Sequence, residues 1–428
     1  MSLFRLLART GLAFLLFAPA THLMAQAPPP TDPKAACAAD EKSSACLSSL
    51  LAAIQQLQQR VHEMEDKQAA ATAAPAAQAA VDSPMPDMPM PTESVGTPKL
   101  QIHGFSHVTA STIDHQATVI PPPTGQLISN RTTFTLGNVD LYITSKLSEK
   151  WSMLAEVNFE ADDTNNFAID MERLLVQYKP SDLLQLSVGR FHTEYGYYNT
   201  AFHHGSWFET AISRPLLFQF EDSGGILPAH NVGVSAIGLV PSGGWGLHYI
   251  AEVGNGVPHD GTVQSHLDNN NGKATNLGFY IKPQWASGLR AGFAWYQEHV
   301  TTPSLAASVK ENDFIAHVVY ITPKFEFLNE GALVRHKDDL TGHIYNTPGF
   351  YTQISRAWGK YRPYFRYQYI NSPTHEPLNN GINLYAGPSA GLRIDVSDFV
   401  ALKVQYDHTT RRSLPSTNAL ATQISFTF

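Results

Sequence analysis

The sequence predicts an all-β fold, a transmembrane antiparallel β-barrel of about 16 strands, preceded by a short periplasmic coiled-coil helix. Three observations support this prediction. Residues 99–428 alternate between apolar and polar side chains, which is the period of a β-strand. Many alternating segments span ten residues or more, a length that suits tilted membrane strands. Short turns alternate with long polar loops, as they do in outer-membrane barrels.

The chain begins with a segment that has the order of a secretion signal. Arg5 and Arg9 give a basic start, residues 11–18 form an apolar run too short to span a bilayer, and small residues follow at 23–27. We therefore expect residues 1–25 to be a signal peptide, cleaved after Ala25 or Ala27. The chain is then exported from the cytoplasm.

Residues 26–45 are expected to form an N-terminal periplasmic segment. Cys37 lies in this segment and Cys46 directly follows it. In an oxidising compartment the two thiols could close a small loop through a disulfide; two unpaired thiols and pairing between chains are the alternatives. Two ligands are too few for a metal site, and we expect neither a metal nor a cofactor.

A heptad pattern predicts a coiled-coil helix at residues 46–68. The apolar positions advance in steps of three and four: Leu47, Leu50, Ile54, Leu57, Val61 and Met64. Because so short a helix is marginal in water, something else must hold the chains together; the alternative is an amphipathic helix packed on its own domain. Residues 69–98 read as an Ala/Pro-rich linker. Its methionines suit Cu(I), but a Pro-spaced linker explains the composition.

The barrel prediction assigns residues 99–428 to strands and their connections. Two regions, 168–193 and 325–335, alternate poorly, so 14 and 18 strands are the alternatives. Short turns are expected at 147–150, 179–182, 241–244, 286–288, 358–360 and 396–398. Strands are expected at 99–112, 132–147, 151–161, 168–179, 183–193, 229–240, 244–255, 273–283, 288–300, 312–322, 325–335, 346–358, 361–371, 382–396, 399–410 and 417–428.

The last predicted strand carries apolar side chains at Ile424, Phe426 and Phe428. A closed barrel has no free edge, so this strand should pair with the first one and turn these side chains toward lipid. We expect the three residues to act as an assembly signal for the barrel-assembly machinery, and Phe428 to lie in the periplasmic aromatic girdle. An even number of strands places both barrel ends on the periplasmic side, where the helix and linker belong.

This layout, from signal peptide to terminal ISFTF, resembles bacterial outer-membrane porins over the whole mature chain. The helical prefix is similar to that of trimeric porins with periplasmic coiled coils. The stretch LQLSVGRFHTEYGYYN at 184–199 is similar to the glycine-arginine strand of phosphate-selective porins, although the Lys-dense loop of an anion trap is absent. The resemblance implies a homotrimer in the outer membrane of a Gram-negative bacterium, in contact with outer-membrane lipid, and no enzyme activity.

Porin resemblance also implies that the third external loop, here about 194–228, folds into the lumen as a constriction loop. Its charged and histidine residues are Glu194, His203, His204, Glu209, Arg214, Glu221 and Asp222. A basic wall is expected to line the pore opposite this loop, because lipid-facing Arg is costly at mid-bilayer. Its residues are Arg290, Arg362, Arg366, Arg393 and Lys403.

An acidic loop facing a basic wall would create a transverse field across a narrow pore. The alternative is that these charges merely solvate a wide lumen. His203 and His204 could bind a metal together with His192, but loop decoration is favoured in a chain with 18 His.

The leading functional prediction is a water-filled channel for passive diffusion of small hydrophilic solutes. A channel specific for small anions such as phosphate or dicarboxylates, or for sugars, is the alternative. A net charge of −8 argues against a nucleic-acid partner. The other classes considered are an outer-membrane enzyme, for which the sequence offers no Ser/His/Asp grouping with usable spacing, and a structural tether that reaches the cell wall through the helix.

Overall fold

The computed structural model describes residues 52, 55, 59, 99–117, 127–161, 165–202, 205–220, 225–256, 272–301, 305, 307–379, 382–412 and 414–428, with the backbone alone at 115–117 and 127–131. The chain divides into two units, Met1–Glu93 and Ser94–Phe428. Several predictions lie outside the described residues: the signal peptide, segment 26–45, the linker, Cys37, Cys46, His203, His204, Glu221 and Asp222. Ala52, Gln55 and Gln59 are helical, while the heptad positions of the predicted coiled coil are not described.

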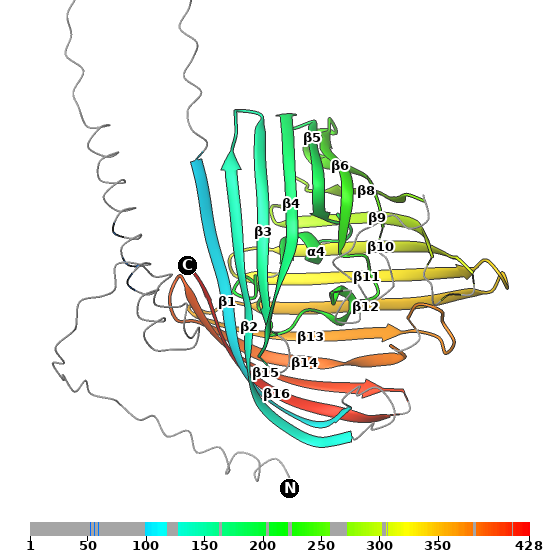
Figure 1. The fold of residues 1–428 in the computed structure, drawn as a ribbon. Coiled ribbons are helices and arrows are strands. Elements are labelled where there is room, and N and C mark those ends of the chain that lie inside the picture. Colours follow the sequence, from blue (N-terminus) through cyan, green and yellow to red (C-terminus); the bar gives the residue numbers. More distant parts are fainter. Residues whose placement is uncertain are drawn as a thin grey trace, which may run out of the picture. The chain divides into compact units, whose positions relative to one another are not determined.

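The second unit is a closed antiparallel barrel of sixteen strands, each paired with its neighbours along the chain (Figure 1). This confirms the predicted all-β antiparallel barrel and its strand number, while the coiled-coil helix before it stays a prediction. The strands are β1 (Lys99–Ala117), β2 (Leu127–Lys146), β3 (Trp151–Ala161), β4 (Phe167–Ser181), β5 (Leu184–His192), β6 (His230–Val240), β7 (Leu247–Gly254), β8 (Ala274–Ile281), β9 (Leu289–Val300), β10 (Val309–Ile321), β11 (Phe325–Asp338), β12 (Ile344–Arg356), β13 (Tyr361–Asn371), β14 (Leu384–Asp395), β15 (Val400–Arg411) and β16 (Leu414–Thr427).

Pairing of β16 with β1 closes the barrel, as the alternating C-terminal segment predicts. The pair runs from Phe105 opposite Thr427 to Ile113 opposite Ala419. Two backbone hydrogen bonds then join Gly104 and Phe428, at 2.7 and 2.9 Å. A Cβ atom on Gly104 would lie 2.2 Å from the Phe428 ring, so only glycine lets this ring lie across β1. Phe428 remains 63% exposed, which is the exposure expected of a girdle residue.

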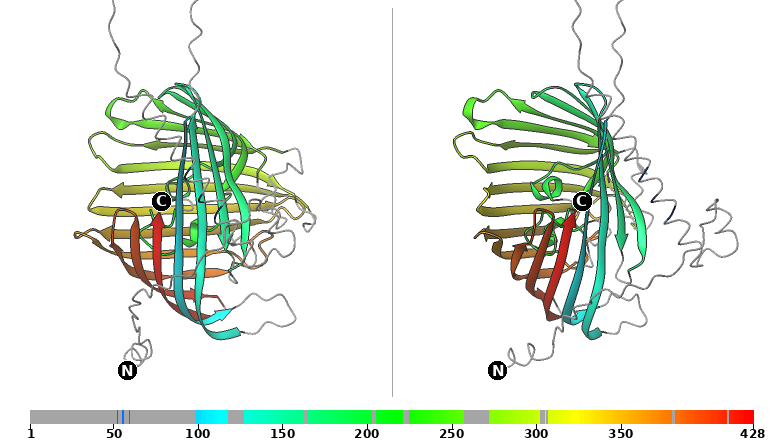
Figure 2. Two further views of the ribbon diagram at one scale, coloured as in Figure 1. Left: turned by 60° about the vertical axis from the view of Figure 1, so that its left-hand side comes forward. Right: turned by 90° about the vertical axis from the view of Figure 1, so that its left-hand side faces the viewer.

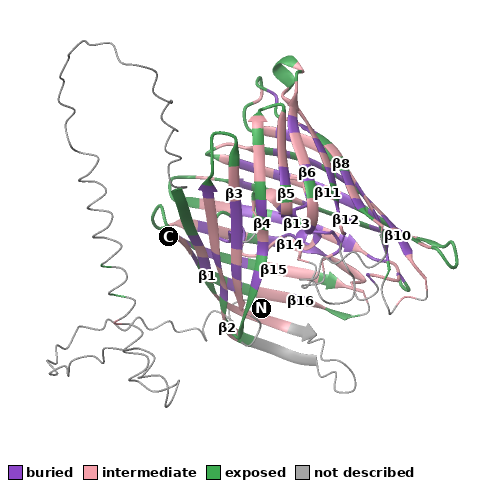
Figure 3. Ribbon diagram, turned by 45° about the horizontal axis from the view of Figure 1, so that its top comes forward, coloured by how far each residue is buried: buried purple, intermediate pink, exposed green. Residues whose placement is uncertain are grey.

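Buried and exposed side chains alternate along the strands (Figure 3). On β10 the outward residues Phe314 and Val318 are exposed, whereas Ile315 and Val319 are buried on the inward face. Exposed large apolar residues recur on strand after strand, which gives the barrel an apolar outer surface. No helix among the described residues is long and apolar enough to cross a membrane.

Antiparallel pairing places alternate connections at the same end of the barrel. Short turns at 147–150, 182–183, 241–246, 282–288, 322–324, 357–360 and 396–399 lie at one end, here called the short-turn end. The turn at 241–246 contains a 3₁₀ turn, η2 (Gly243–Trp245). The opposite end, here called the long-loop end, carries the longest connections, which join β5 to β6, β7 to β8 and β13 to β14. The short–long rhythm read from the sequence is confirmed for these, but β15 and β16 are joined at the same end by residues 412–413 alone, and the connections 162–166 and 339–343 are also short.

Several strands extend further at the long-loop end than the alternation predicts. β1 continues to Ala117 and β2 begins at Leu127, and β11 and β16 are longer in the same direction. Hairpin hydrogen bonds continue there, but water wets both faces beyond the bilayer, so apolar and polar residues need not alternate.

The poor alternation in residues 168–193 has a local cause. The pairing of β3 with β4 shifts register next to Glu156, and the pairing of β4 with β5 shifts between Tyr178 and Ser181. Such bulges insert a residue and change which side chains face inward. Gly189 adds a positive φ of 135° in β5, a conformation that glycine adopts most easily. The segments are strands, as predicted, with an interrupted period.

The segment between β5 and β6, residues 193–229, is called the inner loop below, and its described residues, 193–202, 205–220 and 225–229, fold into the barrel. It contains a helical turn, α4 (Tyr198–Ala201), and a 3₁₀ turn, η1 (Leu216–Phe218). Two further views show this turn of helix enclosed by the strands (Figure 2). The constriction loop predicted at about 194–228 falls in this segment, whose position determines what the inward-facing side chains of the barrel contact.

Candidate functional site

The inner loop packs on an apolar area of the barrel's inward face. Loop side chains Tyr195, Tyr198 and Phe218 form one buried cluster with inward-facing residues of β9 to β13. The cluster also contains Leu217, Ile226, Leu227, Ala294, Ile315, Val319, Leu328, Ala332, Val334, Tyr351 and Ile370. The rings of Tyr198 and Phe218 stack with centroids 5.6 Å apart, and Tyr351 meets both edge-on. Apolar burial therefore holds the loop against one wall, called the loop-bearing wall.

A carboxylate from β11 binds the start of α4. Tyr197 N and Tyr198 N donate hydrogen bonds to Glu330 at 2.5 and 3.0 Å, and the Tyr351 hydroxyl donates a third at 2.6 Å. The helical turn has no side-chain cap of its own, so its first amides need an acceptor from elsewhere. Glu330 supplies it from the wall, and its negative charge suits a helix N-terminus.

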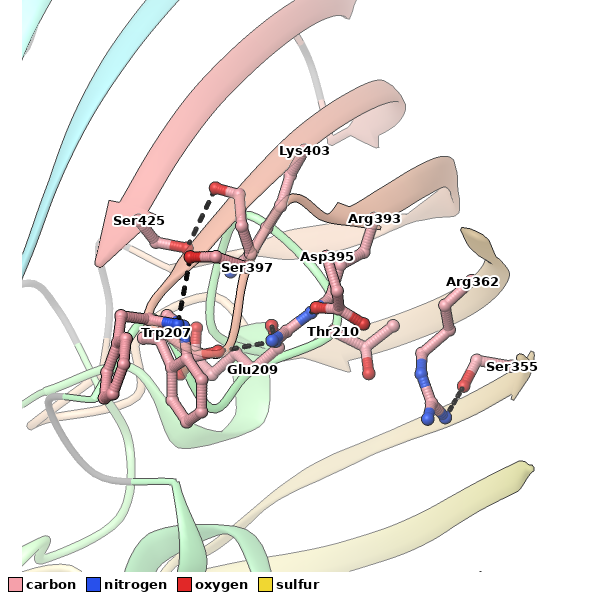
Figure 4. A network of polar contacts seen from close by, with 12 residues as sticks. Trp207, Glu209, Thr210, Ser355, Arg362, Arg393, Asp395, Ser397, Lys403 and Ser425 are labelled. Atoms are coloured by element: carbon pink, nitrogen blue, oxygen red, sulfur yellow. Dashed lines mark hydrogen bonds and ion pairs between the residues drawn. The ribbon is translucent and has the colours of Figure 1, made fainter. Parts of the chain in front are cut away.

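Four residues of the predicted basic wall bind carbonyl groups of the inner loop: Lys403, Arg393 and Arg366, described first, and Arg290. Lys403 donates to the carbonyls of Ser206 and Ala211, at 2.5 and 3.0 Å. Arg393 donates to the carbonyls of Trp207 and Glu209, and points toward them in Figure 4. Arg366 of β13 binds the loop in the same way.

Arg366 donates to the carbonyl and hydroxyl oxygens of Ser213, at 2.7 and 2.8 Å. The loop has little secondary structure, so its buried carbonyls need partners, and long cationic side chains of the wall provide them.

The described charged residues in the middle of the loop, Glu209 and Arg214, contact other groups of the loop. Glu209 accepts a hydrogen bond from the Tyr198 hydroxyl at 2.6 Å. Arg214 donates to the Phe218 carbonyl at 2.6 Å and covers the Phe220 ring at 3.9 Å from its centroid. Burial raises the pKa of the Glu209 carboxyl above its ordinary value of 4.5, and raises the pKa of Tyr198 well above 10.0. Tyr198 therefore remains a hydrogen-bond donor.

The beginning of the loop is bound by a second set of contacts. Glu194 pairs with Arg290 at 3.2 Å, and Arg290 also donates to the Gly196 carbonyl at 3.2 Å. The Glu194 amide donates to Glu252 of β7, a carboxylate that also accepts from Asn276 and Ser235. Arg290 also borders a cavity of about 440 Å³ near the short-turn end, which Tyr197 and Lys282 line as well.

These contacts correct the predicted transverse field for the residues that the structure describes. The basic residues Arg366, Arg393 and Lys403 face inward as predicted, but the loop covers them and they do not line an open pore. The described acidic residues of the predicted loop, Glu194 and Glu209, contact their partners directly and do not face them across open space. Arg362 lies apart from the loop and donates to Ser355 and to the Pro323 carbonyl (Figure 4).

The open space beside the loop lies against the opposite wall, formed by β1 to β4 and called the open wall. A cavity of about 490 Å³ lies between this wall and loop residues 200–202, 205 and 208, and the Phe208 ring reaches across to Phe105 of β1, with centroids 4.9 Å apart. Asp140, Tyr142, Glu156 and Arg173 contribute its polar lining, with Glu156 and Arg173 paired at 2.5 Å. Arg173 also lies over the Tyr142 ring, 5.2 Å from its centroid. His103, Phe105 and Thr427 complete the lining from the barrel.

Acidic groups predominate among the buried charges of the described residues. Asp140 is 1% exposed and accepts no hydrogen bond from a described donor. The buried carboxylates are those of Asp140, Glu156, Asp170, Glu172, Glu209, Glu252, Glu298, Glu311, Asp313, Glu326, Glu330 and Glu376. The buried Arg and Lys side chains are fewer: Arg190, Arg290, Arg366, Arg393 and Lys403. The interior is thus more acidic than the basic-wall prediction implies.

The sequence did not identify Glu330, which binds the loop at the loop-bearing wall, or Arg173, which lines the cavity at the open wall. Glu330 lies in a segment whose apolar and polar residues alternate weakly. The alternation is weak because Leu328, Ala332 and Val334 are apolar on the inward face, where the loop covers them, so it indicates a covered part of the wall. Arg173 was missed because the neighbouring bulge hides its inward orientation from a period-of-two count.

No family model matches the sequence, and no curated protein matches it. The fold does match solved structures. The anion-selective porin from Comamonas acidovorans aligns with a TM-score of 0.55 and 12% identity, covering 77% of this chain and 100% of that chain. The outer membrane channel DcaP of Acinetobacter baumannii gives 0.54 and 10%, covering 77% and 97%.

A third similar structure is the trimer form of OmpT, an outer membrane protein of Vibrio cholerae. It gives a TM-score of 0.51 and 11% identity, covering 77% of this chain and 99% of that chain. Identities this low show the fold alone. The described barrel has the sixteen-stranded fold of outer-membrane porins.

Proposed function

We propose that this protein is an outer-membrane porin, a channel for passive diffusion of small hydrophilic solutes. One observation carries the proposal: a closed barrel with an apolar outer surface holds an inner loop against one wall and leaves a cavity of about 490 Å³ beside the other. A loop bound in this way narrows the lumen without filling it. Solutes would pass between the loop and the open wall, where charged and hydroxyl groups replace part of their hydration.

Selectivity in this proposal favours cations and dipolar solutes over anions. Asp140 and Glu156 line the cavity, whereas Arg366, Arg393 and Lys403 lie under the loop and bind its carbonyls. Arg173 is the cation at this cavity, and Glu156 pairs with it. Among the described residues, the anion-specific alternative, phosphate and dicarboxylates included, therefore has no extended cationic surface along the proposed path.

Assembly as a homotrimer in the outer membrane belongs to the same proposal. The trimer form of OmpT, whose fold is similar, supports it. The predicted coiled coil at 46–68 would align three chains in the periplasm, and the linker at 69–98 would connect it to β1. Ile424 and Phe428 are exposed on β16 and its end, where barrel-assembly machinery could bind them.

Planar-bilayer recording of the purified full-length mature protein tests the function. We expect stepwise conductance increments that occur in threes, and a reversal potential of cation-selective sign in a KCl gradient. Folded protein, verified by its heat-shifted mobility in gels, that carries no current would overturn the channel. An anion-selective reversal potential would overturn the proposed selectivity and leave the channel intact.

A further inference from the structure

Three potential metal ligands meet at the point where the inner loop leaves and re-enters the barrel wall. His192 is the last residue of β5 and His230 is the first residue of β6, and the two pair directly opposite each other. Glu172 comes from the neighbouring strand β4. The pairing of adjacent strands therefore gathers one carboxylate and two imidazoles around both ends of the inner loop.

The ligand atoms are close enough to surround a single ion. One ligand atom from each of Glu172, His192 and His230 lies within 4.8 Å of the other two, and all three residues are buried. Nε2 of His230 lies 2.7 Å from Oε2 of Glu172. The two imidazole rings meet edge to face, with centroids 5.2 Å apart. Two imidazoles with one carboxylate form a donor set that suits Zn²⁺.

Small movements would convert this arrangement into a zinc site. Zinc bonds of about 2.0–2.1 Å in a tetrahedron separate neighbouring ligand atoms by about 3.3 Å. The Glu172–His230 contact would open by about 0.6 Å, and the widest separation would close by about 1.5 Å, which side-chain rotation can supply.

The surroundings of the cluster also suit a metal ion. Glu156 Oε2 lies 3.8 Å from His192 Nε2 and is held by Arg173, so it can orient the imidazole or approach the ion. Phe220 of the inner loop stacks on the His230 ring.

We propose that Glu172, His192 and His230 bind one Zn²⁺ ion that fastens both ends of the inner loop to β4. The ion takes the position between the three ligand atoms and replaces the direct contact of His230 with Glu172. The ends of the loop then move less, and current through the open channel fluctuates less. This site is independent of the channel's solute and selectivity.

Zinc binding is measured directly on the folded, full-length mature protein. The protein in detergent is freed of metal with a chelator, and ZnCl₂ is titrated by calorimetry and by competition with a zinc indicator. We expect one Zn²⁺ per chain. A C37S/C46S variant should bind equally, because no thiol belongs to the site. Co²⁺ in place of Zn²⁺ should give the visible absorption of a tetrahedral site with nitrogen ligands.

Single substitutions locate the ion. E172Q, H192Q and H230Q should each weaken Zn²⁺ binding at least about tenfold, since each removes one of three protein ligands. H317Q is the matched control, because His317 is equally buried on β10 and belongs to no such cluster. It should bind as the unmodified protein does.

Two outcomes would overturn the site: no stoichiometric binding to the folded unmodified protein, or equal binding by H230Q and H317Q. The first means that Glu172 and His230 form an ion pair only. A variant that fails to fold, as judged by heat-shifted gel mobility, leaves the titration of the unmodified protein to decide. Bilayer recordings with and without Zn²⁺ supply a second readout, in which current fluctuations should fall for the unmodified protein and for H317Q alone.

Discussion

The loop-bearing wall and the open wall are built from the same strand pattern, yet their inward faces have different tasks. Inward residues of β9 to β13 are apolar where the loop rests, and polar where its backbone needs partners. Inward residues of β2 to β4 remain charged beside a cavity, with Glu156 paired to Arg173. The difference shows that an inward-facing Arg in a barrel can serve the fold of a loop rather than the passage of solutes.

The same contrast appears in the loop residues. Phe218 is buried in the cluster on the loop-bearing wall, whereas Phe208 is 46% exposed and lines the cavity beside the open wall. One segment thus uses some aromatic residues to attach itself and others to shape the remaining space. The predictions below separate these two roles, starting with the largest expected effect.

Truncation of the anchoring aromatic should have the largest effect. Phe218→Ala should lower the free energy of unfolding by about 3–5 kcal/mol, because it leaves a cavity in a buried cluster. The loosened loop should also raise single-channel conductance. Phe208→Ala is the matched change on the other side and should cost about 1 kcal/mol or less, as expected for a half-exposed ring. Denaturant unfolding in detergent measures both, and equal costs would contradict the distinction between the walls.

Removal of a wall cation under the loop comes next. Arg366→Ala should cost about 1–3 kcal/mol, since it removes a fully buried side chain and leaves the partly buried Ser213 carbonyl without its donor. Arg362→Ala is the control, because this partly exposed side chain binds the Pro323 carbonyl in a short turn. It should cost under about 1 kcal/mol. If Arg366→Ala instead changed ion selectivity and left stability intact, Arg366 would be a pore-lining residue after all.

A charge on the open wall should control selectivity. Arg173→Gln should raise the cation-to-anion permeability ratio by a factor of about two, the scale of one charge in a salt-screened lumen, because it removes a positive charge from the lining of the cavity. Gln keeps a polar side chain beside Glu156, with which Arg173 pairs. The reversal potential reports the effect. Asp398→Asn, in an exposed short turn, should leave it unchanged.

The smallest expected effect is a pH dependence from the loop. Burial raises the pKa of Glu209 above 4.5 despite the nearby cations Lys403 and Arg214. The folded state therefore holds the proton more tightly than the unfolded state, so this group's contribution is full below pH 4.5. It is lost as pH rises through the raised pKa. Glu209→Gln should flatten that part of the stability profile. An unchanged profile would mean that Glu209 is not responsible.

The sequence could predict the barrel wall because each strand carries its own signal. An outward residue such as Val318 must be apolar to face lipid, and Phe314 four residues earlier repeats the requirement on the same face. Closure followed from the same alternation in the last strand. The pattern weakened where strands extend further at the long-loop end, and where a bulge or the inner loop changed what faces inward, as near Glu156 and Leu328.

Only the tertiary structure determined what the inward polar residues do. The sequence placed Lys403 and Arg393 on the inward face, and the fold then brought loop carbonyls onto them from nearly two hundred residues away. Local periodicity reports the solvent on each side of a strand, namely lipid or lumen. Periodicity does not indicate which distant backbone groups occupy the lumen, because that depends on where the loop packs. The alternation of residues along the sequence is thus enough to predict the barrel, whereas long-range contacts decide the role of its charged interior residues.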